Sequence, residues 1–191
     1  MTTIYFVRHA QSDYRSGSDR ERGLTAEAME DRKIVLDFLR DKSVDAFWCS
    51  PYRRSLDTIR EAAEHFGLPI RTDERLRERE SAPGGNVREL FRKRWGDFDW
   101  HEPGGESLRS VQERNIAALT DILTVERDRT VVIGTHGTAL STILHCYDPS
   151  YDCDSFLRII DWMPFVVELD FEGTRFLGKT EHVHVEKVFQ Q

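Results

Sequence analysis

Three fragments far apart in the chain carry side chains suited to handling a phosphoryl group: residues 7–12 (VRHAQS), 50–58 (SPYRRSLDT) and 134–137 (GTHG). A neutral histidine ring nitrogen can attack phosphorus and form a phosphohistidine. A guanidinium can hold phosphoryl oxygens through paired, charge-assisted hydrogen bonds. The residue types therefore predict phosphoryl transfer, with His9 as the nucleophile.

The positions of these fragments strengthen that interpretation. Each follows a short apolar run that is typical of a buried strand: residues 3–7, 44–48 and 130–133. Loops at the carboxyl ends of parallel strands converge in one crevice of an open α/β sheet. A lone histidine or arginine would carry little weight, because such residues are usually solvated or hydrogen-bonded in place. Their joint occurrence after three strands predicts a shared pocket.

Each side chain has a predicted role in that pocket. Arg8 and Arg54 would bind the phosphoryl oxygens, and His136 would donate to the transferring group. Glu78, just after a short predicted strand, would be the acid that protonates the leaving oxygen and then the base toward water. That role requires its carboxyl group to be protonated near neutral pH.

Composition limits the function classes. The chain has 191 residues, of which 39% are hydrophobic and 32% charged, and these values predict a single domain over 1–191. A net charge of −7 disfavours a nucleic-acid partner. No apolar run approaches the roughly 20 residues that span a bilayer, so we expect no membrane partner. The start of the sequence lacks the pattern of a signal peptide, and three cysteines without CxxC spacing suit a reducing compartment, so we expect a cytoplasmic protein.

The remaining elements must position the site. Helices are predicted over residues 25–40, 55–66, 107–124 and 138–146, and strands over 68–72, 163–171 and 175–178, the last two as a hairpin around 172–173. This alternation predicts an α/β fold, a three-layer α/β/α sandwich. Residues 79–106 break the rhythm with paired glycines and an arginine- and tryptophan-rich stretch, and we expect a small cap excursion over the crevice.

These motifs resemble those of the histidine phosphatase superfamily, in its phosphoglycerate mutase-like branch. Residues 7–12 are similar to its arginine-histidine-glycine signature, and 50–58 to its serine-arginine-threonine block, with Arg54 in the phosphate-binding place. Residues 76–78 match its leucine-x-glutamate, 104–107 its glycine-glutamate-serine helix start, and 135–137 its second histidine. The five blocks occur in the family's order between residues 4 and 140, and the rest of the chain matches loosely.

The resemblance implies a phosphoglycerate mutase-like fold and a metal-independent phosphohistidine mechanism without a cofactor. It also implies Gln11 and Arg15 as substrate-binding residues, although Arg15 stands where mutase members usually carry asparagine. Ala10 replaces the usual glycine after the histidine. Classic mutases carry a longer insertion beside the site and a longer C-terminal tail, and this chain is short.

Three functions follow in order of preference. The first is a phosphatase that hydrolyses a small-molecule phosphomonoester. The second is a cofactor-dependent mutase that returns the phosphoryl group to a substrate hydroxyl, and the third is a non-catalytic phosphate-binding member. We expect no metal site, because His182 and His184, although they would share one strand face, have no ligand partners at suitable spacing. The substrate and the oligomeric state stay open.

Overall fold

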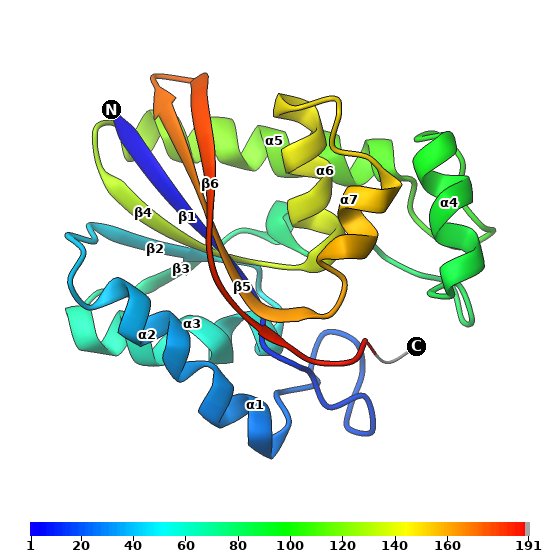
Figure 1. Cartoon of the computed structure of the whole chain (residues 1–191), viewed down its shortest axis with the longest axis horizontal. Coiled ribbons are helices and arrows are strands. Elements are labelled where there is room, and N and C mark those ends of the chain that lie inside the picture. The colour runs from blue at the N-terminus through cyan, green and yellow to red at the C-terminus, as the bar shows by residue number, and fades with distance from the viewer. Residues whose placement is uncertain (190–191) are drawn as a thin grey trace.

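A single mixed sheet organises the molecule. The computed structural model describes residues 1–189, and its sheet has the strand order β3-β2-β4-β1-β5-β6 (Figure 1). The strands are β1 (Thr2–Arg8), β2 (Ala46–Cys49), β3 (Ile70–Thr72), β4 (Thr130–Thr135), β5 (Trp162–Glu172) and β6 (Arg175–Glu186). The first four are mutually parallel, whereas β5 pairs antiparallel with β1 and with β6.

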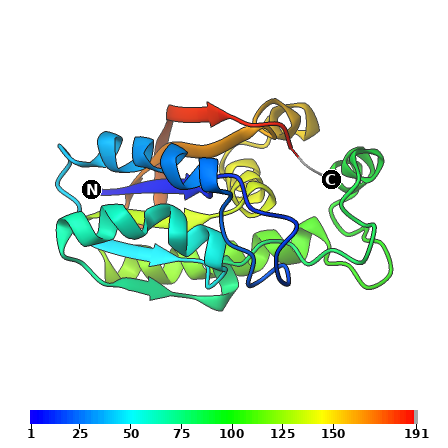
Figure 2. The same ribbon diagram turned by 90° about the horizontal axis from the view of Figure 1, so that it is seen from below.

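Helices cover both faces of this sheet (Figures 1 and 2). One face carries α1 (Ala26–Asp31), α2 (Lys33–Leu39) and α3 (Arg53–Phe66). The other carries α5 (Leu108–Val125), α6 (Gly137–Tyr147) and α7 (Cys153–Arg158). The helix α4 (Arg88–Gly96) stands apart from the sheet at one end of the molecule. The predicted three-layer α/β/α sandwich is confirmed.

The alternation of side chains along the strands creates two cores. On β1, Ile4 and Phe6 pack with α5, α6 and α7, whereas Tyr5 and Val7 pack with α2 and α3. All four side chains are buried. This two-sided burial explains why the strands read as continuous apolar runs, as expected for a parallel sheet covered on both faces.

The expected elements are present, with three main differences. The strand expected over residues 175–178 is β6, which runs to Glu186, because the polar residues 179–182 interrupt its apolar pattern. The predicted helix over residues 25–40 begins as expected, because Thr25 caps it by accepting a hydrogen bond from the amide of Ala28, but it is divided at Arg32 into α1 and α2. The short helix α7 was not expected, because its six residues carry too few turns for an apolar period to show. The predicted hairpin is confirmed, and Gly173 supplies its left-handed φ of 61°.

The excursion at residues 79–106 contains α4 and is held together by a buried ion-pair network. Glu102 accepts from Arg79 Nη2 at 2.9 Å and from Arg94 Nη2 at 3.0 Å. Burial opposes ionisation of this carboxyl, but the hydrogen bonds from Arg79 and Arg94 lower the pKa of Glu102 to about 2. These ion pairs hold the segment together internally, whereas Phe91 and Trp95 of α4 pack it against the apolar core.

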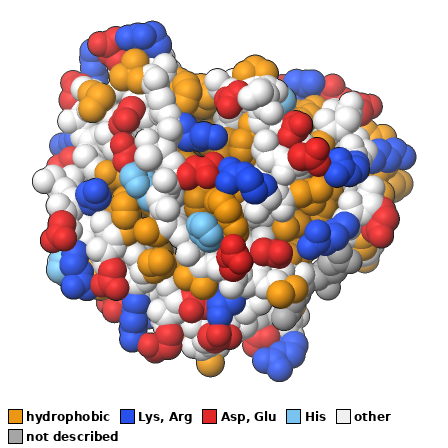
Figure 3. Space-filling model, in the orientation of Figure 1, with side chains coloured by type: hydrophobic (Ala, Val, Ile, Leu, Met, Phe, Trp, Pro, Cys, Tyr) orange, Lys and Arg blue, Asp and Glu red, His pale blue; other side chains and the backbone are white. Residues whose placement is uncertain are grey.

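The surface shows no concentration of one charge on the face drawn in Figure 3, where acidic and basic side chains alternate with apolar ones. Among residues 1–189, no helix combines the length and apolar character needed to cross a membrane. The same residues contain no group of three or more His, Cys, Asp or Glu side chains placed to hold a metal ion.

Candidate active site

The register of β1 against β4 brings the two histidine loops together. Arg8 pairs with Thr135 across the strands, and the amide of His9 donates to the carbonyl of Thr135 at 3.1 Å. The rings of His9 and His136 then lie 5.2 Å apart, centroid to centroid. The parallel pairing of neighbouring strands thus places residues 127 positions apart in one site.

His9 is held as a neutral ring with one nitrogen presented. Its Nδ1 lies 2.7 Å from the carbonyl oxygen of Ala10, so Nδ1 carries the hydrogen and donates it. Arg54 Nε donates to the opposite nitrogen, Nε2, at 3.3 Å. Burial, and then the charges of Arg54 and Arg8, lower the pKa of His9 well below its usual range. Nε2 therefore keeps a lone pair at neutral pH.

His136 is the N-cap residue of α6 and is fully buried beside His9. Its Nε2 lies 2.7 Å from Ser50 Oγ, and the same hydroxyl oxygen accepts a hydrogen bond from the amide of Tyr52. Burial, followed by the charges of Arg54 and His9, lowers the pKa of His136 well below its usual range. Its Nδ1 is buried and has no hydrogen-bond partner among residues 1–189.

The block at residues 50–58 holds the other loops in place. Ser55 Oγ donates to the carbonyl of Thr135 at 2.9 Å, and Thr58 Oγ1 accepts from the amide of Ala10 at 3.0 Å. Directly before Ser55 on α3, Arg54 turns its side chain to His9 and is 2% exposed. Serine and threonine at this spacing therefore clamp the loops while arginine enters the site.

Glu78 faces the same site from the loop after β3. Its carboxylate accepts from the amides of Thr138 and Ala139, each at 3.0 Å, and from the amide of Arg79 at 2.8 Å. Thr138 and Ala139 lie in the first turn of α6, whose amides and dipole favour a negative group. Oε1 accepts two of the three bonds, whereas Oε2 accepts one among the described residues.

Arg8 is the second arginine of the site, and its position accounts for the glycine at position 137. Arg8 Nη1 donates to the carbonyl of Ile159 at 2.6 Å, and its Nε is buried without a partner among the described residues. A Cβ atom at position 137 would lie 3.1 Å from the Arg8 guanidinium, so a side chain there would displace it. Glycine after His136 thus leaves room for the cation.

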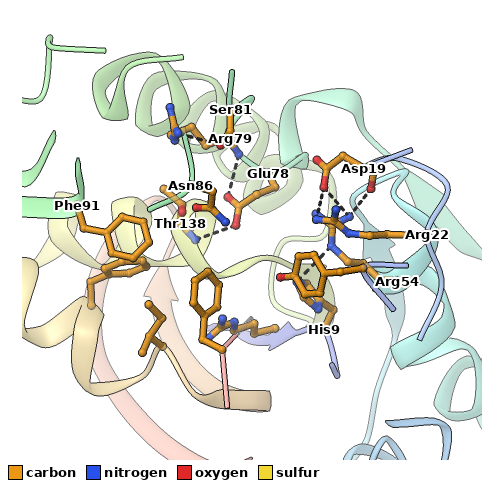
Figure 4. Close-up of a pocket in the computed structure, with 16 residues that line it drawn as sticks. His9, Asp19, Arg22, Arg54, Glu78, Arg79, Ser81, Asn86, Phe91 and Thr138 are labelled. Atoms are coloured by element: carbon orange, nitrogen blue, oxygen red, sulfur yellow. Dashed lines mark hydrogen bonds and ion pairs between the residues drawn. The ribbon is translucent and has the colours of Figure 1, made fainter. Parts of the chain in front are cut away.

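These residues line a cavity of about 290 Å³, drawn in Figure 4. The predicted residues in its lining are Arg8, His9, Arg54 and Glu78, and His136 lies against His9. The structure thus brings these five together. Their roles stay predictions, because geometry alone does not test them.

The loop between β1 and α1 adds residues that were not predicted for the site. Arg54 Nη1 donates to the carbonyl of Asp19 and lies 3.3 Å from its Oδ1. Arg22 forms an ion pair with the Asp19 carboxylate and lies over the Tyr14 ring. Tyr14, Asp19 and Arg22 all line the cavity. No sequence signal assigned Asp19, because a polar loop carries no period from which its direction could be inferred.

Gln11 and Arg15 are not brought to the cavity. Gln11 Nε2 donates to the carbonyl of Val188 at 3.4 Å, outside the lining. The Arg15 side chain is 89% exposed and pairs with Asp13 at 3.2 Å. The loop turns Arg15 to solvent and Arg22 inward, so the geometry gives no support to Gln11 and Arg15 as substrate-binding residues.

His182 and His184 lie on β6, and neither belongs to a group of metal-ligating side chains among residues 1–189. His182 Nε2 is 2.7 Å from Glu168, and the His184 ring stacks on Trp162 at 3.8 Å. Both histidines thus have structural partners.

Curated relatives include phosphatases and mutases. A glucosyl-3-phosphoglycerate phosphatase of Mycolicibacterium vanbaalenii is 25% identical over 160 residues, which cover 73% of this chain and 71% of that one. Phosphoserine phosphatase 1 of Hydrogenobacter thermophilus is 29% identical over 171 residues, covering 82% and 80%. A probable phosphoglycerate mutase of Proteus mirabilis is 27% identical over 158 residues, covering 75% and 74%.

The fold is also that of a solved relative and of a known family. The structure of Bacillus stearothermophilus YhfR superposes with a TM-score of 0.76 at 23% identity, covering 93% of this chain and 95% of that one. The family model described as histidine phosphatase superfamily (branch 1) matches residues 4–161. With two histidines, two arginines and a glutamate gathered at the carboxyl ends of its parallel strands, the chain belongs to the histidine phosphatase superfamily, branch 1.

Proposed function

We propose that this chain hydrolyses small phosphomonoesters through a covalent phosphohistidine on His9, without a metal or an added cofactor. Family membership and the phosphatase relatives support hydrolysis. The single observation that carries the mechanism is the state of His9. Its Nδ1 hydrogen is bound to Ala10 and its Nε2 faces Arg54, so a neutral nucleophilic nitrogen stands beside a cation that can hold phosphoryl oxygens.

In the first step the His9 Nε2 lone pair attacks phosphorus, and the ester P–O bond breaks. Arg8, Arg54 and His136 stabilise the charge on the equatorial oxygens. For this step Glu78 must carry a proton on Oε2, although the amides of α6 favour its carboxylate form; it gives that proton to the leaving oxygen as the alcohol departs. Oε2 suits this role because Oε1 already accepts two backbone bonds.

In the second step water attacks the phosphohistidine. The Glu78 carboxylate takes a proton from that water as the new P–O bond forms, and the P–N bond breaks. His9 returns to its neutral form, Glu78 is protonated again, and inorganic phosphate leaves. The residues end the cycle as they began it, so no outside reductant, oxidant or ion is consumed.

A mutase reaction is the second candidate, favoured by the similarity to phosphoglycerate mutases. It shares the first step and differs only in the acceptor, which is a substrate hydroxyl instead of water. A non-catalytic phosphate-binding role fits less well, because phosphate binding alone gives no reason to keep a neutral histidine between two arginines.

The test combines turnover, trapping and product analysis. Purified enzyme is mixed with ³²P-labelled phosphomonoester, quenched in alkali and examined for an acid-labile, base-stable phosphoprotein. Released phosphate with no rearranged ester supports the phosphatase, and a rearranged ester supports the mutase. Activity is expected to survive exhaustive dialysis against EDTA, and loss with recovery on adding zinc or magnesium would overturn the metal-free mechanism.

We also propose a cytoplasmic location. The three cysteines, Cys49, Cys146 and Cys153, are free thiols, which suits a reducing compartment. Fractionation of cells with an antibody against the chain tests this location.

A further inference from the structure

The cavity continues beyond the phosphoryl site to an end built of apolar side chains. In Figure 4, Arg54 and Arg22 lie at one end and Phe91 at the other, with Glu78 between them. The apolar side chains that line the cavity are Phe91, Phe156, Ile160 and Phe189. Because Glu78 is the proposed donor to the leaving oxygen, the space beyond it is where the alcohol part of an ester would lie.

Three separate parts of the chain build this apolar end. Phe91 comes from α4 of the cap, Phe156 from α7, and Phe189 from the segment after β6. The Phe91 ring lies 5.3 Å from that of Phe156 and 6.2 Å from that of Phe189, both in edge-on geometry. Such edge-to-face pairs fix the ring positions. The Trp95 ring stacks on that of Phe156 at 5.8 Å, so the rings are also supported from the core.

The segment that carries Phe189 is attached at several points. The amide of Phe189 donates to Asp161 Oδ1, and the amide of Lys187 donates to the carbonyl of Asp161, each at 2.7 Å. Lys187 Nζ also pairs with Asp31 on α1 at 3.1 Å. The hydrogen bond from Gln11 to Val188 belongs to the same attachment. Phe189 is therefore a fixed part of the wall.

The cation that the cap contributes to this wall is already bonded. Arg79 Nη1 donates to the carbonyl of Glu106 at 2.8 Å. Its Nη2 donates to Ser81 Oγ at 2.8 Å and to Glu102 Oε1 at 2.9 Å. A carboxylate on the alcohol would have to compete with buried Glu102 for this guanidinium. The polar groups left to meet a ligand here are neutral ones such as Asn86.

We propose that the alcohol part of the substrate is a neutral, mainly apolar group of roughly phenyl size, held by Phe91, Phe156, Ile160 and Phe189. This inference rests on the proposed function, because it specifies the ester that the same site would hydrolyse. It distinguishes this chain from relatives named for phosphoserine or a phosphoglycerate derivative, whose substrates carry a carboxylate. A phosphate and a phenyl-sized group together are compatible with a cavity of about 290 Å³.

The first experiment compares two primary alkyl esters, 2-phenylethyl phosphate and O-phosphoserine, so that both leaving groups are alkoxides. We expect kcat/KM to be about tenfold or more higher for the phenylethyl ester, the size that one well-filled apolar pocket gives. Phe189→Ala should lose about tenfold on that ester, mainly through KM, and less than twofold on phosphoserine. Phe176→Ala, which removes a half-buried phenylalanine on the far part of β6, is the matched control and should change neither.

A binding measurement separates this inference from the proposed function. Calorimetry compares 3-phenylpropylphosphonate with 2-amino-4-phosphonobutyrate, which cannot be hydrolysed, on wild-type and Phe189→Ala protein. Tighter binding of the phenyl compound that depends on Phe189 supports the inference even if no ester is turned over, a result that would defeat only the hydrolytic proposal. Preference for the amino-acid compounds in both experiments, or equal losses for both ligands in Phe189→Ala, would overturn the inference while leaving hydrolysis intact.

Discussion

The proposed role of His9 as a nucleophile requires a neutral ring, and its surroundings favour that form. Burial and two neighbouring guanidinium groups, Arg54 and Arg8, disfavour the imidazolium form. The hydrogen bond to Ala10 fixes which nitrogen carries the hydrogen. The same cations that would bind the phosphoryl group therefore also keep the nucleophile unprotonated, so binding and activation share one set of residues.

His9→Ala is expected to abolish turnover and leave the fold intact. The change removes the attacking nitrogen but no large apolar volume, and loss of a covalent nucleophile commonly costs several orders of magnitude in kcat. Steady-state hydrolysis of nitrophenyl phosphate measures activity, and circular dichroism checks the fold. His65→Ala, which changes an exposed histidine on α3, is the control and should be fully active. A fully active His9→Ala protein would sink the mechanism.

Glu78→Gln is expected to lose far more activity on an alkyl phosphate than on nitrophenyl phosphate. An alkoxide must be protonated as the P–O bond breaks, whereas nitrophenolate leaves without a donor. Arg54→Ala should lose heavily on both, because it binds oxygens common to every ester. The rate measured for each ester is the single-turnover formation of the phosphoenzyme, so that a slower later step does not hide the difference between the two esters. Equal losses for Glu78→Gln on the two esters would place the acid elsewhere, with Glu80 the nearest alternative in the chain.

At the scale of elements, α5 places the loop that carries Glu78. Arg114 donates from Nη1 to the carbonyls of Arg75 and Arg77, at 2.8 and 2.6 Å, and from Nη2 to that of Glu78 at 3.0 Å. Glu106 in turn accepts from Arg114 Nε at 2.8 Å. Burial opposes ionisation, but the contacts with Arg114 lower the pKa of Glu106 to about 2. The Arg114–Glu106 pair therefore fixes the backbone of the loop that carries Glu78, although neither residue lines the cavity.

Arg114→Gln is expected to reproduce the selectivity of the Glu78 variant in weaker form. Glutamine cannot hold three carbonyls, so the acid should be misplaced while the phosphate-binding residues stay in position. We expect roughly a tenfold loss on an alkyl phosphate and about a twofold loss on nitrophenyl phosphate, the direction set by general acid catalysis. Arg109→Gln, an exposed arginine on the same helix, is the control. Equal losses on both esters would mean that Arg114 supports the fold rather than the acid.

The sequence predicts the elements well where one physical pattern dominates. Apolar runs located the buried strands, and two predicted helix ends are correct: residue 25 is the N-cap of α1, and residue 66 is the last residue of α3. The strand-end positions of His9 and His136 sufficed to predict that they meet. Asp19, Arg22 and Phe189 lie in segments without periodicity, so their approach to the cavity depends on tertiary contacts that a single sequence does not encode locally. Arg15 shows the same limit, since its loop turns it to solvent.

At the scale of the whole molecule, one sheet unites both cores and the site. Its β1 strand contributes to both clusters and ends at Arg8, directly before His9, so the same strand builds the core and positions the candidate site. We therefore propose that residues 1–191 form a single domain. Limited proteolysis that releases a stable fragment with its own core would contradict this proposal. The site's location at the centre of the sheet also means that its two buried neutral histidines contribute to the pH dependence of folding.

That contribution has a definite sign. His9 and His136 both have lowered pKa values in the native state, whereas an unfolded histidine titrates near 6.5. Below about pH 6.5 the unfolded chain therefore binds protons that the native chain does not, and the free energy of unfolding must fall as the pH falls. The carboxyls of Glu102 and Glu106, with pKa values of about 2, lose their stabilising charge only below about pH 4.5, so they leave the window between pH 7 and 5 unaffected.

We expect the free energy of unfolding to decrease between pH 7 and pH 5 by about 2 kcal/mol for each of the two rings that stays neutral in the native state. His9→Asn should remove roughly half of this decrease, because the amide that replaces the ring does not titrate. Urea unfolding of wild type, His9→Asn and the exposed control His65→Asn at the two pH values measures it. If His9→Asn and wild type lose the same free energy of unfolding over this window, the His9 ring takes up protons as readily in the native state as in the unfolded chain. That result would mean that burial and the two arginines do not lower the pKa of His9, and it would remove the argument that the site keeps the nucleophile unprotonated.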